Sequence, residues 1–312
     1  MSAELTARIK KLALEAGFHK VGIAPAELPR ERVEGLARWL ERGYEGSMAY
    51  MTRDGLKRAH AGEVLEGARA VISLALSYHH PDDPKPGEGA WGKIARYARG
   101  RDYHTVIGKK LKRLVRSIRE IVPDARVKPY VDTGPIMEKA YAREAGIGFY
   151  GKNTNILTRD RGSWVFLASL ITDLELEFDA PHTGSCGECR LCLDACPTGA
   201  FAGPYELDAR KCISYWTIES REEIPAEIRG RLEGWAFGCD ICQEVCPHNR
   251  KPSVSDEPAF GSESGAGQWL DLRRVLGLGS DGEFAKAFQG TPLKRPKRAG
   301  LERNARAVLE AS

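Results

Sequence analysis

The sequence has no apolar run long enough to cross a bilayer, and its first residues do not form a secretory signal. The N-terminal stretch MSAELTARIKKLALEAGF has the apolar spacing of an amphipathic helix and lacks the central apolar segment and cleavage site of an exported chain. The net charge of +4 is small for 312 residues and does not by itself indicate a nucleic-acid partner. We therefore expect a cytoplasmic protein that is not inserted into a membrane.

Cysteine is absent before position 186 and after position 246, although the sequence contains eight. The first four have the spacing C-x2-C-x2-C-x3-C-P, which is typical of bacterial ferredoxins. In that pattern three thiolates bind one 4Fe-4S cluster and the fourth binds a second cluster. This rule predicts two ligand sets: Cys186, Cys189, Cys192 and Cys246 for cluster 1, and Cys196, Cys212, Cys239 and Cys242 for cluster 2.

Structural zinc and disulfide bonds are the alternatives for these cysteines. A four-cysteine zinc site uses two CxxC pairs, which leaves the rest of the first run and the proline after each closing cysteine unexplained. Disulfide bonds are typical of exported chains, and no export signal is found here. Two iron-sulfur clusters account for all eight residues.

The hydrophobic pattern predicts three domains. Helical and strand patterns alternate up to about residue 175, with 69–77 as a buried strand, 103–121 as a long helix and 126–132 as a further strand. The cysteines follow, and the tail from residue 270 has a helical pattern. We predict an α/β (α+β) domain at 1–175, a ferredoxin-like two-cluster domain at 176–250, and a linker with a short helical C-terminal segment at 251–312.

The run GIGFYG at residues 146–151 matches the glycine spacing of dinucleotide-binding loops. Such loops follow a strand and precede a helix, whereas here a helical pattern comes first and a strand pattern follows. A helix C-cap followed by a tight turn is the better interpretation.

Further motifs surround the cysteine runs along nearly the whole chain: RYARGRDYH, VDTGP, GKNTN, GSW, CISYW and TPLKRPKRAGLERN. Their combination resembles the epoxyqueuosine reductases, cobalamin-dependent enzymes of queuosine synthesis in tRNA. The resemblance implies that the first domain binds cobalamin and that the chain reduces epoxyqueuosine to queuosine at the wobble position of the anticodon. Many members continue into a C-terminal helical-repeat region, whereas this sequence ends at Ser312, so the contacts of that region are not predicted here.

Asp132 in VDTGP is the candidate catalytic residue. The residues alone favour a helix cap, because aspartate commonly precedes a helix that begins with a proline such as Pro135. The resemblance implies instead a general acid that protonates the opened epoxide. Three further residues are candidates for the same pocket: Asp102, His104 and Lys139. Their alternative roles are a helix cap for Asp102, an ordinary surface or core histidine for His104 and a solvated helix position for Lys139.

The polar residues of GKNTN and GSW are the predicted cobalamin contacts, because they offer donors, acceptors and close backbone approach. A polar hairpin turn is the alternative. The predicted contacts are Gly151, Lys152, Asn153, Thr154, Asn155, Gly162 and Ser163, with Ser214, Tyr215 and Asp240 from the cluster domain.

Basic residues gather at 109–116 and near the C-terminus, where they could meet RNA phosphates. We interpret the first group as a solvated helix face. The second lies in TPLKRPKRAGLERN and is the predicted tRNA contact: Lys294, Arg295, Lys297, Arg298 and Arg303. The expected partners are tRNA bearing epoxyqueuosine and an external electron donor, and the expected state is a monomer.

Two other functions are alternatives to this interpretation. A reductive dehalogenase shares the corrinoid domain and the two clusters but typically carries a twin-arginine export signal, which this sequence lacks. A plain ferredoxin-like electron carrier has no need of the first 175 residues.

Overall fold

The computed structural model describes residues 2–311, and the chain forms two compact units. Unit 1 contains the chain up to Gly43 with Tyr50–Ser77 and Tyr103–Glu188, and unit 2 contains Tyr44–Ala49, Tyr78–Asp102 and the chain from Cys189 onward. The three-domain division by sequence order stays a prediction. No helix within residues 2–311 combines the length and the apolar character needed to span a membrane.

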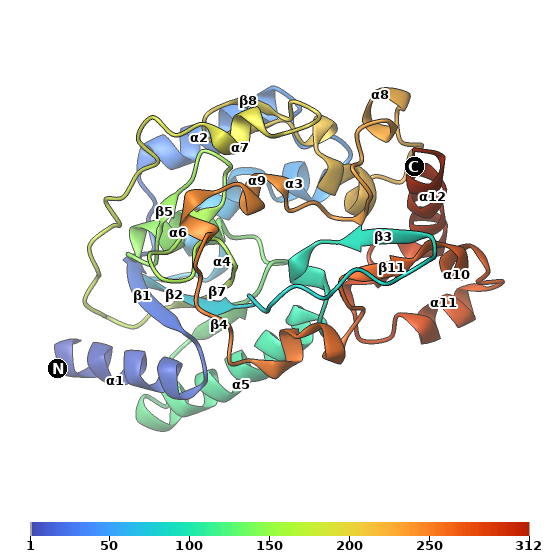
Figure 1. The fold of residues 1–312 in the computed structure, drawn as a ribbon. Coiled ribbons are helices and arrows are strands. Elements are labelled where there is room, and N and C mark those ends of the chain that lie inside the picture. Colours follow the sequence, from blue (N-terminus) through green and yellow to red (C-terminus); the bar gives the residue numbers. More distant parts are fainter. Residues whose placement is uncertain (1, 312) are drawn as a thin grey trace. The chain divides into compact units, whose positions relative to one another are not determined.

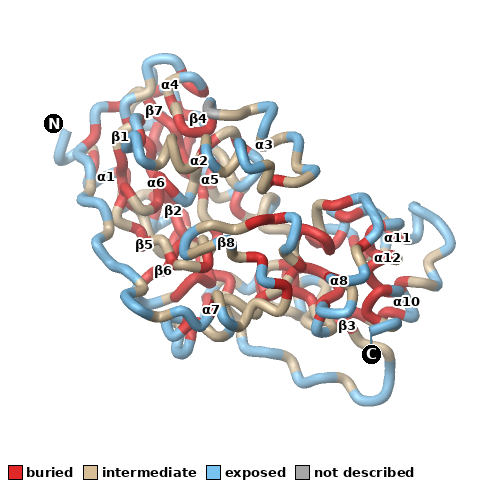
Figure 2. Tube along the Cα trace, turned by 90° about the horizontal axis from the view of Figure 1, so that it is seen from above, coloured by how far each residue is buried: buried red, intermediate tan, exposed pale blue. Residues whose placement is uncertain are grey.

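Unit 1 is built on an antiparallel sheet in the order β1 (Lys20–Pro25), β2 (Ala70–Ser77), β7 (Val165–Thr172) and β4 (Val127–Tyr130). Every residue of β2 is buried, which explains its continuous apolar sequence (Figure 2). β4 is an edge strand, and the chain leaves it directly toward Asp132.

Helices cover both faces of this sheet (Figure 1). α6 (Glu138–Glu144) packs its Ala140 and Tyr141 with Val71, Ala75 and Ile171 of the strands. α5 (Tyr103–Ile121) contacts β4, and α1 (Ser2–Glu15) contacts α5 and β1. The remaining elements of the first half of the chain are α2 (Arg30–Glu41), α3 (Ala49–Asp54), α4 (Ala61–Val64), β5 (Phe149–Tyr150) and β6 (Ile156–Leu157).

Unit 2 contains a three-stranded sheet in the order β10 (Trp235–Phe237), β3 (Trp91–Ile94) and β11 (Trp269–Asp271). α12 (Lys297–Glu310) contacts β10 and α10 (Leu272–Leu276). The other elements are α7 (Leu191–Asp194), β8 (Phe201–Gly203), β9 (Glu206–Leu207), α8 (Ala226–Arg229), α9 (Ile241–Glu244) and α11 (Asp281–Ala287). The mixed α/β architecture and the helical C-terminal segment predicted from the sequence are confirmed.

Candidate active site and cluster-binding region

Asp132 lies in the loop between β4 and α6 with a backbone φ of +59°. This left-handed conformation is uncommon for a residue other than glycine. α6 begins at Glu138, three residues later than the predicted start at Pro135, and its N-cap is Met137. Asp132 is therefore not the cap of this helix.

The first turn of α5 supplies two neighbours of the Asp132 carboxyl group. The Tyr103 hydroxyl donates a hydrogen bond to Asp132 Oδ2 at 2.8 Å, and His104 Nε2 lies 3.3 Å from the same oxygen. The Tyr103 ring stacks on Phe166 of β7 with 4.4 Å between ring centroids, which fixes the hydroxyl. The Asp132 side chain is still 59% exposed, so a bound molecule can reach it.

The backbone of Asp132 is held by Glu138. The Asp132 N–H points at both carboxyl oxygens of Glu138, at 3.1 and 3.2 Å. Burial, and then the nearby charge of Asp132, raise the pKa of Glu138 to about 8. Sequence reasoning missed Glu138, because an acid in the first turn of a helix is ordinary there.

The other side of the same loop is held by Arg58. The buried Arg58 guanidinium donates to the carbonyl of Gly134 at 3.0 Å, and the Arg58 carbonyl accepts the N–H of Met137 at 3.0 Å. A Cβ atom at Gly134 would lie 2.4 Å from the Tyr130 ring, so this turn requires glycine. No motif in the sequence pointed to Arg58.

The GKNTN segment forms a tight polar turn in unit 1. The Gly151 N–H donates to the Asn155 carbonyl at 2.8 Å, and Thr154 has a φ of +64°. Lys139 Nζ donates to the carbonyl of Thr154 at 3.0 Å and to Asn155 Oδ1 at 3.3 Å, so this lysine ties α6 to the turn.

The same turn contacts a predicted cluster ligand. The Lys152 N–H donates to Cys186 Sγ at 3.4 Å, and Lys152 Nζ donates to the Gly187 carbonyl at 2.7 Å. The Gly162 carbonyl accepts the Thr158 N–H at 2.8 Å. Two of the predicted cofactor residues are nearly inaccessible, namely Asn153 and Ser163.

Asp102 differs from the other candidate pocket residues. It immediately precedes α5 but belongs to unit 2, where its N–H donates to the Gly290 carbonyl at 2.8 Å. Its place in a pocket with Asp132 stays a prediction.

The four predicted ligands of cluster 2 are close enough to perturb one another. Burial raises the pKa of Cys212, Cys239 and Cys242, and the charge of Cys196 raises all three further. Backbone N–H groups also bond to these sulfurs, as from Ala200 to Cys196 Sγ at 3.4 Å. Half-buried thiols with N–H donors fit a metal cluster, because bound iron supplies the positive charge that stabilises thiolates.

Unit 2 contains three of the four predicted ligands of cluster 1, because Cys186 belongs to unit 1. Cys192 in α7 and Cys246 after α9 are both buried, and α7 contacts α9. Within residues 2–311, no three His, Cys, Asp or Glu side chains form a site for a single metal ion. A cube differs from such a site because its ligands bind separate corners.

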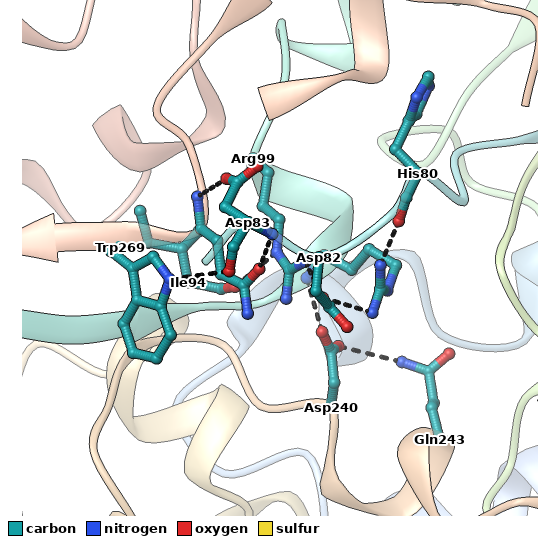
Figure 3. A network of polar contacts seen from close by, with 10 residues as sticks. His80, Asp82, Asp83, Ile94, Arg99, Asp240, Gln243 and Trp269 are labelled. Atoms are coloured by element: carbon teal, nitrogen blue, oxygen red, sulfur yellow. Dashed lines mark hydrogen bonds and ion pairs between the residues drawn. The ribbon is translucent and has the colours of Figure 1, made fainter. Parts of the chain in front are cut away.

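Tyr215 and Asp240 are fixed by contacts inside unit 2. Tyr215 Oη accepts the Ser47 N–H at 2.8 Å. Asp240 is 2% exposed and accepts the Arg96 N–H at 2.6 Å and a Gln243 N–H at 3.3 Å (Figure 3). Burial raises the pKa of Asp240 to about 6. The predicted corrin contacts of Ser214, Tyr215 and Asp240 stay predictions.

Arg96 and Arg99 form the rest of this network. Both are buried, and their guanidinium groups pair with Asp82 Oδ1 at 2.8 and 2.6 Å. The network joins residues 78–102 to the segment that carries Cys239. It therefore fixes the position of a predicted ligand segment.

The C-terminal basic residues are largely neutralised by neighbours. Arg295 pairs with Glu219 at 2.8 Å, and Arg298 pairs with Asp281 at 2.8 Å and with Glu302 at 2.6 Å. Lys294 and Lys297 are exposed.

Arg303 is a correction to the predicted tRNA surface. It is 8% exposed and donates to the carbonyls of Trp216, Ser220 and Glu222. These bonds tie α12 to the preceding chain, so we remove Arg303 from the predicted phosphate contacts.

The cationic face of α5 has the opposite character. Lys112, Arg116 and Arg119 are exposed and lie on one helix face, since they are four and three residues apart. Within residues 2–311, the structure shows no ion pair for these three side chains. They line a groove of about 640 Å³ whose other walls include Val127 and Pro129 of β4.

Comparisons with known proteins agree with this arrangement. Residues 185–249 match the model of a 4Fe-4S double cluster binding domain, which confirms the predicted two-cluster domain. Residues 58–133 match the model described as epoxyqueuosine reductase QueG, DUF1730. The epoxyqueuosine reductase of Gloeobacter violaceus is 44% identical over 317 residues, covering 99% of this chain and 97% of the relative.

Solved structures give the same result. A structure of epoxyqueuosine reductase with a tRNA-Tyr epoxyqueuosine-modified stem loop has a TM-score of 0.89 and 30% identity, covering 99% of this chain and 81% of that chain. A Bacillus subtilis epoxyqueuosine reductase with its catalytic aspartate loop swung out of the active site has a TM-score of 0.88 and 30% identity, covering 99% of this chain and 82% of that chain.

A reductive dehalogenase has a TM-score of 0.50 at 15% identity, covering 97% of this chain and 38% of that chain, which shows a likeness of fold alone. The near-complete coverage by relatives of about 40% identity is decisive. The chain belongs to the epoxyqueuosine reductase family.

Proposed function

We propose that this chain is the oxidoreductase that converts epoxyqueuosine in tRNA to queuosine, with cobalamin and two 4Fe-4S clusters as cofactors. One observation carries the proposal within unit 1. The loop that presents Asp132 beside Tyr103 and His104 is followed by α6, whose Lys139 holds the polar turn that contacts the cluster ligand Cys186. A proton donor, a polar cofactor loop and an iron-sulfur ligand therefore occur in one structural unit.

Reduction of an epoxide to an alkene consumes two electrons and two protons and releases water. Cobalamin would supply a strongly nucleophilic metal centre for attack on an epoxide carbon, and the clusters would supply electrons. The protein must protonate the oxygen that leaves. Asp132 is suited to this step because its carboxyl group is exposed and oriented by the Tyr103 hydroxyl.

His104 would complete the proton path, since its Nε2 lies 3.3 Å from Asp132 Oδ2 and histidine exchanges protons near neutral pH. Tyr103 orients the carboxyl group through the bond from its stacked ring. The corrin amides would bond to residues 151–155 and 162–163, where the backbone is already ordered by internal hydrogen bonds. That polar donor set fits an amide-rich ligand.

We also propose that the tRNA backbone follows α5. The first turn of this helix contacts Asp132, and the cationic face that begins farther along extends to Arg119, roughly 24 Å from Tyr103 at 1.5 Å per residue. A nucleotide bound at Asp132 would bring neighbouring phosphates toward unpaired cations. The C-terminal group, Lys294, Arg295, Lys297 and Arg298, remains a second candidate surface.

One reaction tests the proposed function. Anaerobically reconstituted protein is supplied with cobalamin, a chemical reductant and tRNA bearing epoxyqueuosine, and the digested nucleosides are analysed by mass. Loss of one oxygen from the modified nucleoside is expected, and no change would refute the assignment. Turnover of a halogenated aromatic compound in place of the tRNA would favour the dehalogenase alternative. The physiological electron donor is expected to be a separate protein, and the enzyme is expected to act as a monomer.

A further inference from the structure

We propose that Glu138 is a positioning residue that holds the Asp132 loop, residues 131–137, through the backbone N–H of Asp132. Where catalysis is measured, this inference rests on the proposed function. The hold itself is a property of the folded chain and can be tested without turnover.

Glu138 lies on a helix that is packed in place, whereas Asp132 lies in a loop whose backbone conformation needs a stabilising contact. Glu138 is the first residue of α6, and the same turn of that helix is anchored by the buried Ala140 and Tyr141. The Asp132 side chain is exposed, and its backbone has a left-handed φ, a conformation that is energetically unfavourable for a residue other than glycine. The bond from its N–H to the Glu138 carboxyl group, at 3.1 and 3.2 Å, offsets that strain.

The loop has a second attachment that does not involve Glu138. Arg58 binds the Gly134 carbonyl at 3.0 Å, and this bond does not depend on the Glu138 carboxyl group, so we expect it to persist when Glu138 is changed. Loss of the Glu138 carboxyl group should therefore release the Asp132 end of the loop and leave the Gly134 end attached. This asymmetry distinguishes a local hold from general destabilisation.

Three charged groups face Glu138: Asp132 of the loop, His104 of α5 and Lys139 of α6. Burial is the main reason that the pKa of Glu138 is about 8 against an ordinary value of 4.5. The net rise in pKa means that the folded surroundings of Glu138 favour its protonated form through burial and the Asp132 charge, although the bond from the Asp132 N–H by itself favours the ionised form. The stability contributed by this proton is complete below about pH 4.5 and is lost as the pH rises through about 8. Glu138→Gln is an isosteric copy of the protonated form, so its loop should lack this pH dependence.

The direct test is hydrogen exchange, measured by mass spectrometry on peptides that cover the Asp132 loop. Glu138→Ala should speed exchange at the Asp132 end by about tenfold, the scale of one lost hydrogen bond. Glu138→Gln should stay within about twofold of the parent at pH 7, because the amide oxygen still accepts the bond. Glu227→Ala is the matched control, since it removes an exposed acid from the first turn of α8.

Catalysis gives a second measurement. Glu138→Ala should lower kcat by about tenfold or more, because misplacing a reactive group costs up to about a hundredfold, with a smaller change in KM for tRNA. In an Asp132→Asn background the same change should have almost no further effect, since Glu138 acts through Asp132. A plot of kcat against pH should show a transition near pH 8 for the parent protein and none there for Glu138→Gln.

Unchanged exchange in Glu138→Ala would overturn the inference, as would an equal rate loss in the parent and Asp132→Asn backgrounds. If Glu138→Ala does not fold, as judged by iron content and thermal melting, the decision passes to Glu138→Gln. Exchange in that variant that keeps the pH dependence of the parent would equally refute the hold. Faster exchange with full activity would show that the hold exists but that turnover does not depend on it, which would overturn Glu138 as a positioning residue.

Discussion

Removing the positive charges from the cationic face of α5 should weaken tRNA binding and make the affinity less dependent on salt concentration. The change is the joint replacement of Lys112, Arg116 and Arg119 by glutamine. These side chains are exposed, lie on one helix face and have no ion pair within residues 2–311. Because no ion pair in the described part of the chain holds these three side chains, their charges are available to phosphates.

The expected size follows from counterion release. Each phosphate contact contributes about 0.7 to 0.9 to the slope of log affinity against log salt. Three lost contacts therefore lower the slope by about 2 to 3, which corresponds to roughly a hundredfold in affinity at 0.15 M salt. Glu120 also lines the groove, and its charge places the true value at the lower end of this range.

The assay is filter binding of epoxyqueuosine tRNA across a salt series, with cobalamin affinity as the check on folding. The matched control replaces Lys294, Arg295 and Arg298 by glutamine, because it removes the same number of charges. Arg295 and Arg298 are already paired with Glu219, Asp281 and Glu302.

This control should change the slope by less than about one, since paired cations release few counterions on binding. The reasoning is refuted if the control lowers the slope by 2 or more and the α5 variant leaves it unchanged. The anticodon stem would then dock on the C-terminal surface predicted from the sequence.

Three other changes have defined outcomes. Asp132→Asn keeps the shape of the side chain without its transferable proton, so product formation should fall by about a hundredfold or more while cobalamin and tRNA still bind; near-normal turnover would exclude the general acid. Cys212→Ala should lose about half of the iron, all of it from cluster 2, as measured by iron analysis and EPR; full iron content would break the ligand assignment. Arg303→Met leaves three buried carbonyl acceptors without their donor and should reduce stability by about 2–3 kcal/mol in thermal melting, with an unchanged salt slope for tRNA.

The parts of this protein that could be predicted from sequence are those encoded by local spacing. The cysteine runs predicted the double-cluster domain that the family model confirms. The apolar run at 69–77 predicted β2, because a fully buried strand needs no polar face. The helical period at 103–121 predicted α5 within its exact bounds at Tyr103 and Ile121.

The parts that could not be predicted depend on contacts between distant residues. β3, from the first third of the chain, pairs with β10 some 140 residues later, and no local pattern signals such a partner. A run of basic residues shows charge but not which of its members are buried, which is why Arg303, whose guanidinium group bonds to backbone carbonyls of distant residues, appeared to be a surface residue. The left-handed φ of Asp132 is likewise invisible in the letters VDTGP, so the helix was expected to begin too early.

The contrast between Asp132 and Glu138 has a physical reason. A proton donor for a large substrate must be reachable, so its side chain cannot be immobilised by burial, and Asp132 is indeed 59% exposed. Its position must then be fixed through its backbone and through directed bonds from half-buried or stacked neighbours, which Glu138 and Tyr103 supply. The residue that supplies the backbone contact is desolvated instead, since burial raises the pKa of Glu138 to about 8. The exposure of the Asp132 carboxyl group and the desolvation of the Glu138 carboxyl group therefore both follow from the need for a proton donor that is reachable and still fixed in position.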